Sequence, residues 1–168
     1  KYLENYTLGL GWEGVIKGMG FKGELSYFMP YGNSNENNTF VGSISFDYYF
    51  KNDTSLNVST LYNSGGISNT DSYNASPLYS ESIDVKHLMP NKLSFFCQVS
   101  KTFTPAMTGS IASIYATDID MVFLMPQFTY SVSQNWDFDV TGQLYYGKQE
   151  DGVSNLGNSV YLRFRYSF

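Results

Sequence analysis

The sequence is poor in the residues from which most catalytic and metal sites are built. Its single cysteine, Cys97, excludes an intrachain disulfide and a cysteine metal cluster. Its single histidine, His87, lies in a polar segment with Asp84 nearby, and one loop histidine is more often solvated or packed than catalytic. We therefore expect no enzymatic activity and no catalytic residue.

No motif indicates a cofactor or a metal. Two Gly-x-Gly runs, Gly9–Gly11 and Gly18–Gly20, do not open a helix and so are not phosphate cradles. The acidic pairs Asp118/Asp120 and Glu150/Asp151 could hold a divalent cation, but they lack the spacing of a calcium-binding loop. Solvated loop charges are the favoured interpretation, and we expect neither a cofactor nor a metal.

Long hydrophobic runs and positive charge are also scarce. No apolar run reaches the ~18 residues that a membrane helix needs, and the mean hydropathy is −0.25. The net charge of −5 makes nucleic acid an unfavourable partner, because binding it requires a basic patch. Aromatic residues are abundant at 18% of the chain, with 15 Tyr and 13 Phe. Membrane strands alternate lipid-facing and lumen-facing residues, so this composition is still compatible with a membrane barrel.

Alternation of apolar and polar residues is the dominant pattern. In the final stretch, Val160, Leu162, Phe164, Tyr166 and Phe168 take alternate places, which predicts a strand with one apolar and one charged face. Similar alternation predicts nine strands in all. They lie at about 2–13, 19–29, 40–50, 55–62, 93–103, 108–116, 122–132, 136–146 and 160–168.

Two predicted strands are irregular. The pattern in 108–116 is too weak to assign its faces, and Pro126 falls on the apolar face of 122–132. Because proline cannot donate to the ladder, it implies a local break or bulge.

The predicted connections alternate between short and long. Short ones fall near 14–18, 51–54, 104–106 and 133–135, and longer ones at 30–39, 63–91, 117–121 and 147–158. Outer-membrane barrels show this asymmetry, with short periplasmic turns and longer external loops. The pattern predicts an all-β fold, an antiparallel transmembrane β-barrel. Because nine is an odd number, we expect residues 1–168 to form one incomplete barrel, the C-terminal part of a larger one, with a long external loop at about 63–91. Residues 80–89 in that loop could hold a short helix.

Two segments resemble a known class of proteins. The run from Phe123 to Phe138 looks like the penultimate hairpin of porin-like barrels of Gram-negative bacteria, and Tyr161–Phe168 is similar to their last strand. The resemblance implies an outer-membrane location with the first strand beginning outside and the C-terminus in the periplasm. It also implies that Tyr166 and Phe168 form a signal for the barrel-assembly machinery. The expected partners are outer-membrane lipid, lipopolysaccharide, that machinery, and other outer-membrane subunits or a missing N-terminal barrel segment.

Charged residues fall opposite the apolar positions of the predicted strands, where a barrel would place them in its lumen. Because antiparallel pairing would bring the acidic pair on 136–146 close to the arginines of the last strand, the charges have two interpretations. One is a transverse field that selects solutes by charge, and the other is an ion-pair network that rigidifies the lumen. The lumen-facing charges are Lys22, Glu24, Asp47, Asp137, Asp139, Arg163 and Arg165.

Two functions remain open on this sequence. The first is a porin-like channel for small polar solutes. The second is a structural barrel that anchors or caps a larger outer-membrane assembly, with 63–91 as its docking surface. Either function requires a lipid-facing set, for which we expect Tyr6, Leu8, Leu10, Phe46, Tyr48, Phe138, Val140, Leu162 and Phe164.

Overall fold

The chain folds into one antiparallel β-sheet. The computed structural model describes residues 4–31, 37–66, 91–149 and 152–168, and over these residues the fold is all-β apart from a single turn of 3-10 helix, η3 (Thr117–Ile119). The nine predicted strands are confirmed. They are β1 (Asn5–Ile16), β2 (Met19–Pro30), β3 (Thr39–Tyr49), β4 (Thr54–Asn63), β5 (Leu93–Thr104), β6 (Met107–Ala116), β7 (Met121–Ser133), β8 (Trp136–Gln149) and β9 (Gly152–Tyr166).

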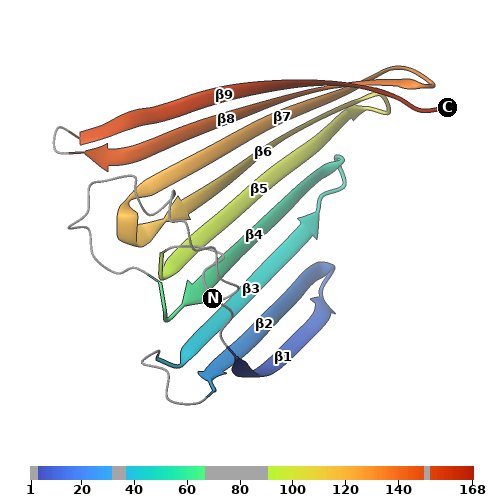
Figure 1. Cartoon of the computed structure of the whole chain (residues 1–168). Coiled ribbons are helices and arrows are strands. Elements are labelled where there is room, and N and C mark those ends of the chain that lie inside the picture. The colour runs from blue at the N-terminus through green and yellow to red at the C-terminus, as the bar shows by residue number, and fades with distance from the viewer. Residues whose placement is uncertain (1–3, 32–36, 67–90, 150–151) are drawn as a thin grey trace.

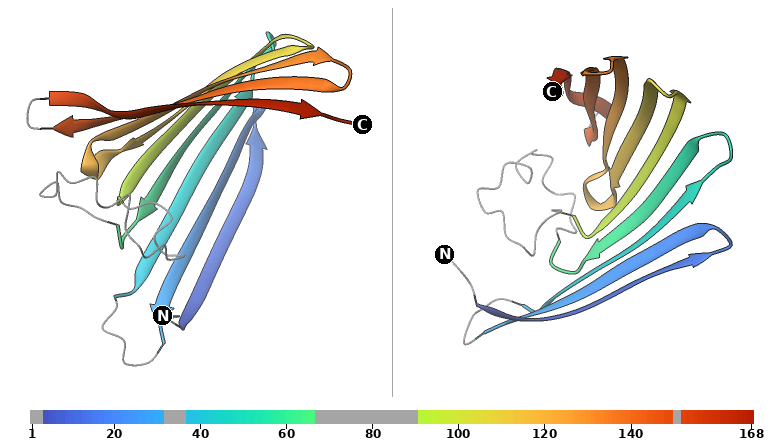
Figure 2. Two further views of the ribbon diagram at one scale, coloured as in Figure 1. Left: turned by 45° about the horizontal axis from the view of Figure 1, so that its top comes forward. Right: turned by 90° about the vertical axis from the view of Figure 1, so that its right-hand side faces the viewer.

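The sheet is an uninterrupted meander. Each strand pairs with its neighbours in sequence, in the order β1 to β9, and β1 and β9 form the two edges (Figure 1). The sheet twists and curls but does not close, so that its edges stay apart (Figure 2). The predicted all-β antiparallel sheet is confirmed, and the described strands are not closed into a barrel. No helix among the described residues is long and apolar enough to cross a membrane.

The two faces of the sheet differ sharply in chemistry. Register partners share a face, so the pairs Leu8↔Tyr27, Phe46↔Val58 and Phe138↔Phe164 place one set of alternate residues together. We call this the apolar face. It includes all nine residues of the predicted lipid-facing set, and the other set of alternate residues, rich in Ser, Thr, Asn, Gln and charge, forms the polar face.

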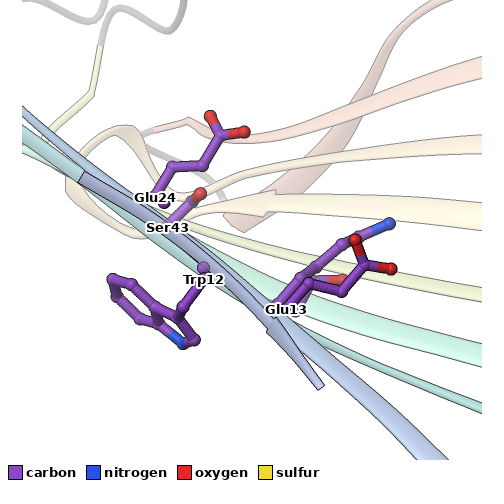
Figure 3. A pocket seen from close by; sticks show the side chains of 8 residues that line it. Trp12, Glu13, Glu24 and Ser43 are labelled. Atoms are coloured by element: carbon purple, nitrogen blue, oxygen red, sulfur yellow. The ribbon is translucent and has the colours of Figure 1, made fainter. Parts of the chain in front are cut away.

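The apolar face is uncovered. Leu8 and Phe164 are 64% and 69% exposed, and among the described residues only Ala112 and Ala116 are buried hydrophobic side chains. Both alanines lie on the polar face, where small residues such as Ser94 are also buried, as expected for the concave side of a curled sheet. Figure 3 shows Glu13, Glu24 and Ser43 on that side of the strands and Trp12 on the other. As far as the structure describes the chain, the sheet is therefore a single layer without a hydrophobic core of its own.

Aromatic residues on the apolar face gather towards both ends of the strands. We call the end with the connections at 17–18, 50–53, 105–106 and 134–135 the turn end, and the opposite end the loop end. At the turn end Trp136 packs on Tyr166 with ring centroids 5.0 Å apart, and at the loop end Phe40 lies 6.3 Å from Tyr62. The residues between these two rows are mostly aliphatic, among them Leu10, Leu25, Ile44, Val58, Val99, Ile111, Leu124, Val140 and Leu162.

Glycines on the apolar face make room for these rings. A Cβ added to Gly23 would overlap the Trp12 ring, and one added to Gly14 would overlap the ring of Phe21. Each pair consists of residues opposite one another in the β1–β2 register. The aromatic side chain thus covers the gap that its glycine partner leaves in the layer.

Several predicted boundaries were wrong. The connection at 14–18 is only two residues, because β1 continues to Ile16, and Lys17 and Gly18 have φ of 51° and 81°. Positive φ at both central residues is typical of a type I′ hairpin turn. The loop expected at 147–158 is mostly strand, since β8 runs to Gln149 and β9 starts at Gly152.

The register of the sheet shows the faces of β6 and the effect of Pro126 on β7, the two strands whose sequence patterns are irregular. In β6, Ile111 and Tyr115 lie on the apolar face opposite Pro126 and Val122. Pro126 interrupts pairing towards β8, where the partners skip from Leu124↔Leu144 to Gln127↔Thr141 without a change of register. The predicted break is therefore confirmed and no bulge forms there. The proposed helix at 80–89 lies outside the described residues.

Candidate functional site

The polar face carries all seven charged residues predicted to share one face. The register places Asp137 opposite Arg165, Asp139 opposite Arg163, and Asp47 opposite Gly20. Lys22 and Glu24 alternate with the apolar positions of β2. The charges form two groups at opposite edges of the sheet, one on β1–β3 and the other on β8–β9.

Asp139 is the most buried of these carboxylates. Its side chain is 6% exposed, and its Oδ2 accepts a hydrogen bond from Arg163 Nε at 2.7 Å and forms an ion pair with Arg163 Nη2, also at 2.7 Å. Its Oδ1 accepts a hydrogen bond from the Thr129 hydroxyl at 2.7 Å. Two guanidinium nitrogens contact one carboxylate oxygen and a hydroxyl donates to the other, which fixes the orientation of the arginine.

Asp137 repeats this arrangement nearer the turn end. Its Oδ2 accepts hydrogen bonds from Nε and Nη2 of Arg165 at 3.1 and 2.6 Å, and its Oδ1 accepts one from the Ser131 hydroxyl at 2.8 Å. The predicted pairing of the β8 aspartates with the β9 arginines is confirmed. The guanidinium groups remain accessible to solvent, since the side chains of Arg163 and Arg165 are 62% and 54% exposed.

Sequence reasoning missed the two hydroxyl donors. Thr129 and Ser131 lie on β7, directly opposite Asp139 and Asp137. The available signal was their alternation with apolar residues on the neighbouring strand, which places them on the same face as the aspartates. The result is two parallel hydroxyl–carboxylate–guanidinium rows across three strands.

The group on β1–β3 is less tightly connected. Glu13 lies opposite Lys22, and together with Glu24 they line a hollow of about 510 Å³ on the polar face (Figure 3). A second hollow of about 440 Å³ is lined by Lys22, Asp47 and uncharged polar residues of β4 and β5. Within the described ranges, the ion pairs of the polar face are those of β8 with β9.

The strands between the two groups carry no charge on the polar face. Ser55, Asn57, Gln98 and Ser100 occupy positions near the second hollow. Further towards the loop end, a row of apolar residues crosses this face, as the register shows. We call it the apolar row; it consists of Phe96, Ile114, Phe123 and Tyr145.

The acidic residues considered as cation ligands have protein partners. Asp118 Oδ2 accepts hydrogen bonds from the backbone N–H groups of Lys92 and Leu93 at 2.9 and 3.1 Å. Asp120 accepts a hydrogen bond from Tyr115 at 3.0 Å and lies 3.5 Å from Lys148 Nζ. The described part of the chain contains no cluster of three potential metal ligands. Glu150, Asp151 and His87 lie outside the described residues.

The proposed assembly signal lies at the turn end. Tyr166 is on the apolar face beside Trp136, and Phe168 follows the end of β9 with its side chain fully exposed. The Ser167 N–H donates to the Asn135 carbonyl at 2.9 Å, which holds this end beside the β7–β8 turn. Both residues are accessible to another protein.

Comparison of the chain with models of protein families, with curated proteins and with solved structures found no match. The functional conclusion therefore depends on the two faces of the sheet and on the charges of the polar one.

Proposed function

We propose that the chain is a sector of a bacterial outer-membrane β-barrel that acts as a porin-like channel for passive diffusion of small polar solutes. The observation that carries this proposal is the uncovered apolar face of a single-layer sheet. Water-soluble proteins rarely expose contiguous apolar patches larger than a few hundred Å². Lipid would cover the apolar face, and the polar face would line an aqueous lumen.

The distribution of residues along the strands supports a membrane setting. The strands contain 10 to 15 residues, and a membrane-spanning strand needs about 9–11. The aliphatic band between two aromatic rows fits a hydrocarbon layer between two interfaces, where aromatic rings are enriched. Lys101 lies on the apolar face near the turn end, and its Nζ donates to the Asn52 carbonyl at 3.1 Å. This is the behaviour of a lysine that reaches towards an interface.

Two connections at the loop end, 31–38 and 64–92, are longer than any connection at the turn end, and this difference supports an orientation. Short turns are periplasmic in such barrels and longer connections are external. The turn end, with Tyr166 and Phe168, would therefore face the periplasm, where the assembly machinery reads the last strand. The loop end would face outward, towards lipopolysaccharide.

A second candidate is a structural barrel that anchors or caps an outer-membrane assembly. The apolar row favours it, because aromatic residues on an otherwise polar face suit contact with a polypeptide. In the proposed channel, the apolar row would narrow the lumen next to the polar residues of the same face.

Ion selectivity tests the channel. Replacing both arginines, R163Q with R165Q, leaves the two β8 carboxylates without counter-charges, so the reversal potential across a planar bilayer should shift towards cation preference. The matched variant, D137N with D139N, should shift it towards anions, and combining all four substitutions should return it towards the starting value. An open channel with an unchanged reversal potential would remove these residues from selectivity. An intact barrel that does not conduct would favour the structural role.

A further inference from the structure

We infer that the gap between β1 and β9 is filled by an odd number of amphipathic β-strands that lie outside residues 1–168, and not by a second copy of this chain. The inference rests on the proposed barrel, since only a closed barrel requires the gap to be filled. It is carried by the exposure of the two edges and by the directions of their strands.

Among the described residues, β1 and β9 each pair with a strand on one side only, and their apolar side chains are more exposed than those midway along interior strands. On β1, Leu8 and Leu10 are each 64% exposed, and on β9 Leu162 is 64% exposed. Midway along interior strands, Val58 and Val99 are less exposed, at 37% and 39%. An added strand on each side would bring the edge residues into the interior range.

The β1 edge also lacks the devices that keep a free edge from pairing. Soluble proteins protect edges with proline, bulges or inward-pointing charges. β1 contains no proline, pairs with β2 over its whole length without a register shift, and has one charged residue, Glu13, near its end. Apolar and polar residues alternate regularly along β1. Both faces of the sheet therefore extend to this edge, as they do on a strand that has a neighbour on each side.

Direction decides what can fill the gap. Because the nine strands alternate in direction, β1 and β9 both run from the loop end to the turn end (Figure 1). Direct closure of β1 onto β9 would form a parallel seam. An all-antiparallel barrel therefore needs an odd number of added strands, of which the first and the last run from the turn end to the loop end.

A second copy does not meet this requirement. Two copies inserted in the same orientation would join β9 of one to β1 of the other, which again gives parallel seams. An inverted copy would form antiparallel seams, but its loop end would lie on the opposite side of the membrane. The remaining occupant is a different polypeptide segment with the same alternation.

The β9 edge defines the chemistry of that segment. The guanidinium groups of Arg163 and Arg165 contact the β8 aspartates through Nε and Nη2, and their Nη1 donors take no part in these contacts. The strand beside β9 should therefore present hydrogen-bond acceptors on its polar face, such as carboxylates, amides or hydroxyls. On its other face it should carry apolar residues level with Leu162 and Phe164.

Disulfide crosslinking in native outer membranes tests the inference. In a C97S background, one cysteine replaces Tyr6, Leu8 or Leu10 and a second replaces Val160, Leu162 or Phe164. The control pair is V140C with L162C, whose positions are register partners on neighbouring strands. We expect the control to crosslink within the chain and all nine edge combinations to form neither an internal disulfide nor a dimer. In the same membranes, hydrogen exchange should show β1 amides as protected as those of β4.

Several results would overturn the inference. In the crosslinking experiment they are a disulfide between β1 and β9 of one chain, or a crosslinked dimer of this chain. In the exchange experiment it is rapid exchange of every second β1 amide. The inference would also fail if the two strands that pair with β1 and β9 ran in opposite directions. Quenching of Trp12 and Trp136 by brominated lipids is measured in parallel. Absence of quenching would reject the membrane proposal itself, whereas quenching together with an edge disulfide would reject only the odd-strand inference.

Discussion

An arginine in place of Val140 gives the sharpest test of the membrane proposal. Val140 lies on the apolar face between Phe128 on β7 and Leu162 on β9. The neighbouring residue, Thr141, lies on the polar face opposite Gln127 and Tyr161. The variants V140R and T141R therefore place the same charge one residue apart on opposite sides of the sheet.

The position of Val140 sets the expected cost. It is four residues from Trp136 in the turn-end aromatic row, which is about 13 Å along the strand and about 10 Å along the axis of a tilted barrel. From this depth the guanidinium reaches the interface only in part. We expect V140R to cost about 2–4 kcal/mol, the range for arginine near the midplane. This corresponds to a decrease of about 30-fold to 700-fold in the folded-to-unfolded ratio.

The free energy of unfolding is measured by urea titration in lipid vesicles, and tryptophan fluorescence follows the transition. The variants are compared at the same dependence of this free energy on urea concentration. T141R should stay within about 1 kcal/mol of the unmodified chain, because the polar face is hydrated. Equal stability of V140R and T141R would refute the assignment of the apolar face to lipid. So would a cost confined to T141R, since that result would place water on the apolar face.

Two further predictions concern packing and the ion pairs. G23V should displace the Trp12 ring, destabilise the protein by about 1–3 kcal/mol and shift the tryptophan emission, whereas G11V should do neither, because a Cβ at Gly11 meets no atom closer than 3.9 Å. D139N should lower the thermal midpoint more than D137N, because the side chain of Asp139 is 6% exposed and that of Asp137 is 22% exposed. Circular dichroism in detergent micelles would measure both midpoints, and the reverse order would contradict the importance of burial.

The strands were predictable because each carries its signal locally. Alternation in segments such as Phe40–Phe50 survives without knowledge of any partner. The faces of β6 were not predictable, since Gly109 and Ser113 dilute its apolar set and only pairing with β7 reveals it.

The boundary errors have the same origin. The residues from Gly152 to Asn158 were predicted to belong to a loop because they are rich in Gly, Ser and Asn. Pairing with β8 nevertheless makes them a strand, since the ladder overrides a weak local preference. Gly14 was predicted to lie in a turn, whereas it is a strand residue that makes space for Phe21.

The charged site was predictable as a set and not in its partners. Alternation places Asp137, Asp139, Arg163 and Arg165 on one face, and antiparallel pairing brings the two strands together. Which arginine meets which aspartate depends on register, which the turn and the neighbouring strands fix together. Alternation also places the hydroxyl donors of β7 on this face, but their pairing with the aspartates depends on a second register.

The meander order has a consequence for how such a chain can change over generations. Every strand is hydrogen-bonded only to the strands before and after it in sequence. Duplication or loss of a hairpin would change the sheet by two strands and leave the direction of all later strands unchanged. A single inserted strand would instead send every later turn to the opposite rim. Length variation among descendants of this chain should therefore come in steps of one hairpin, joined at the loop end where long connections tolerate it.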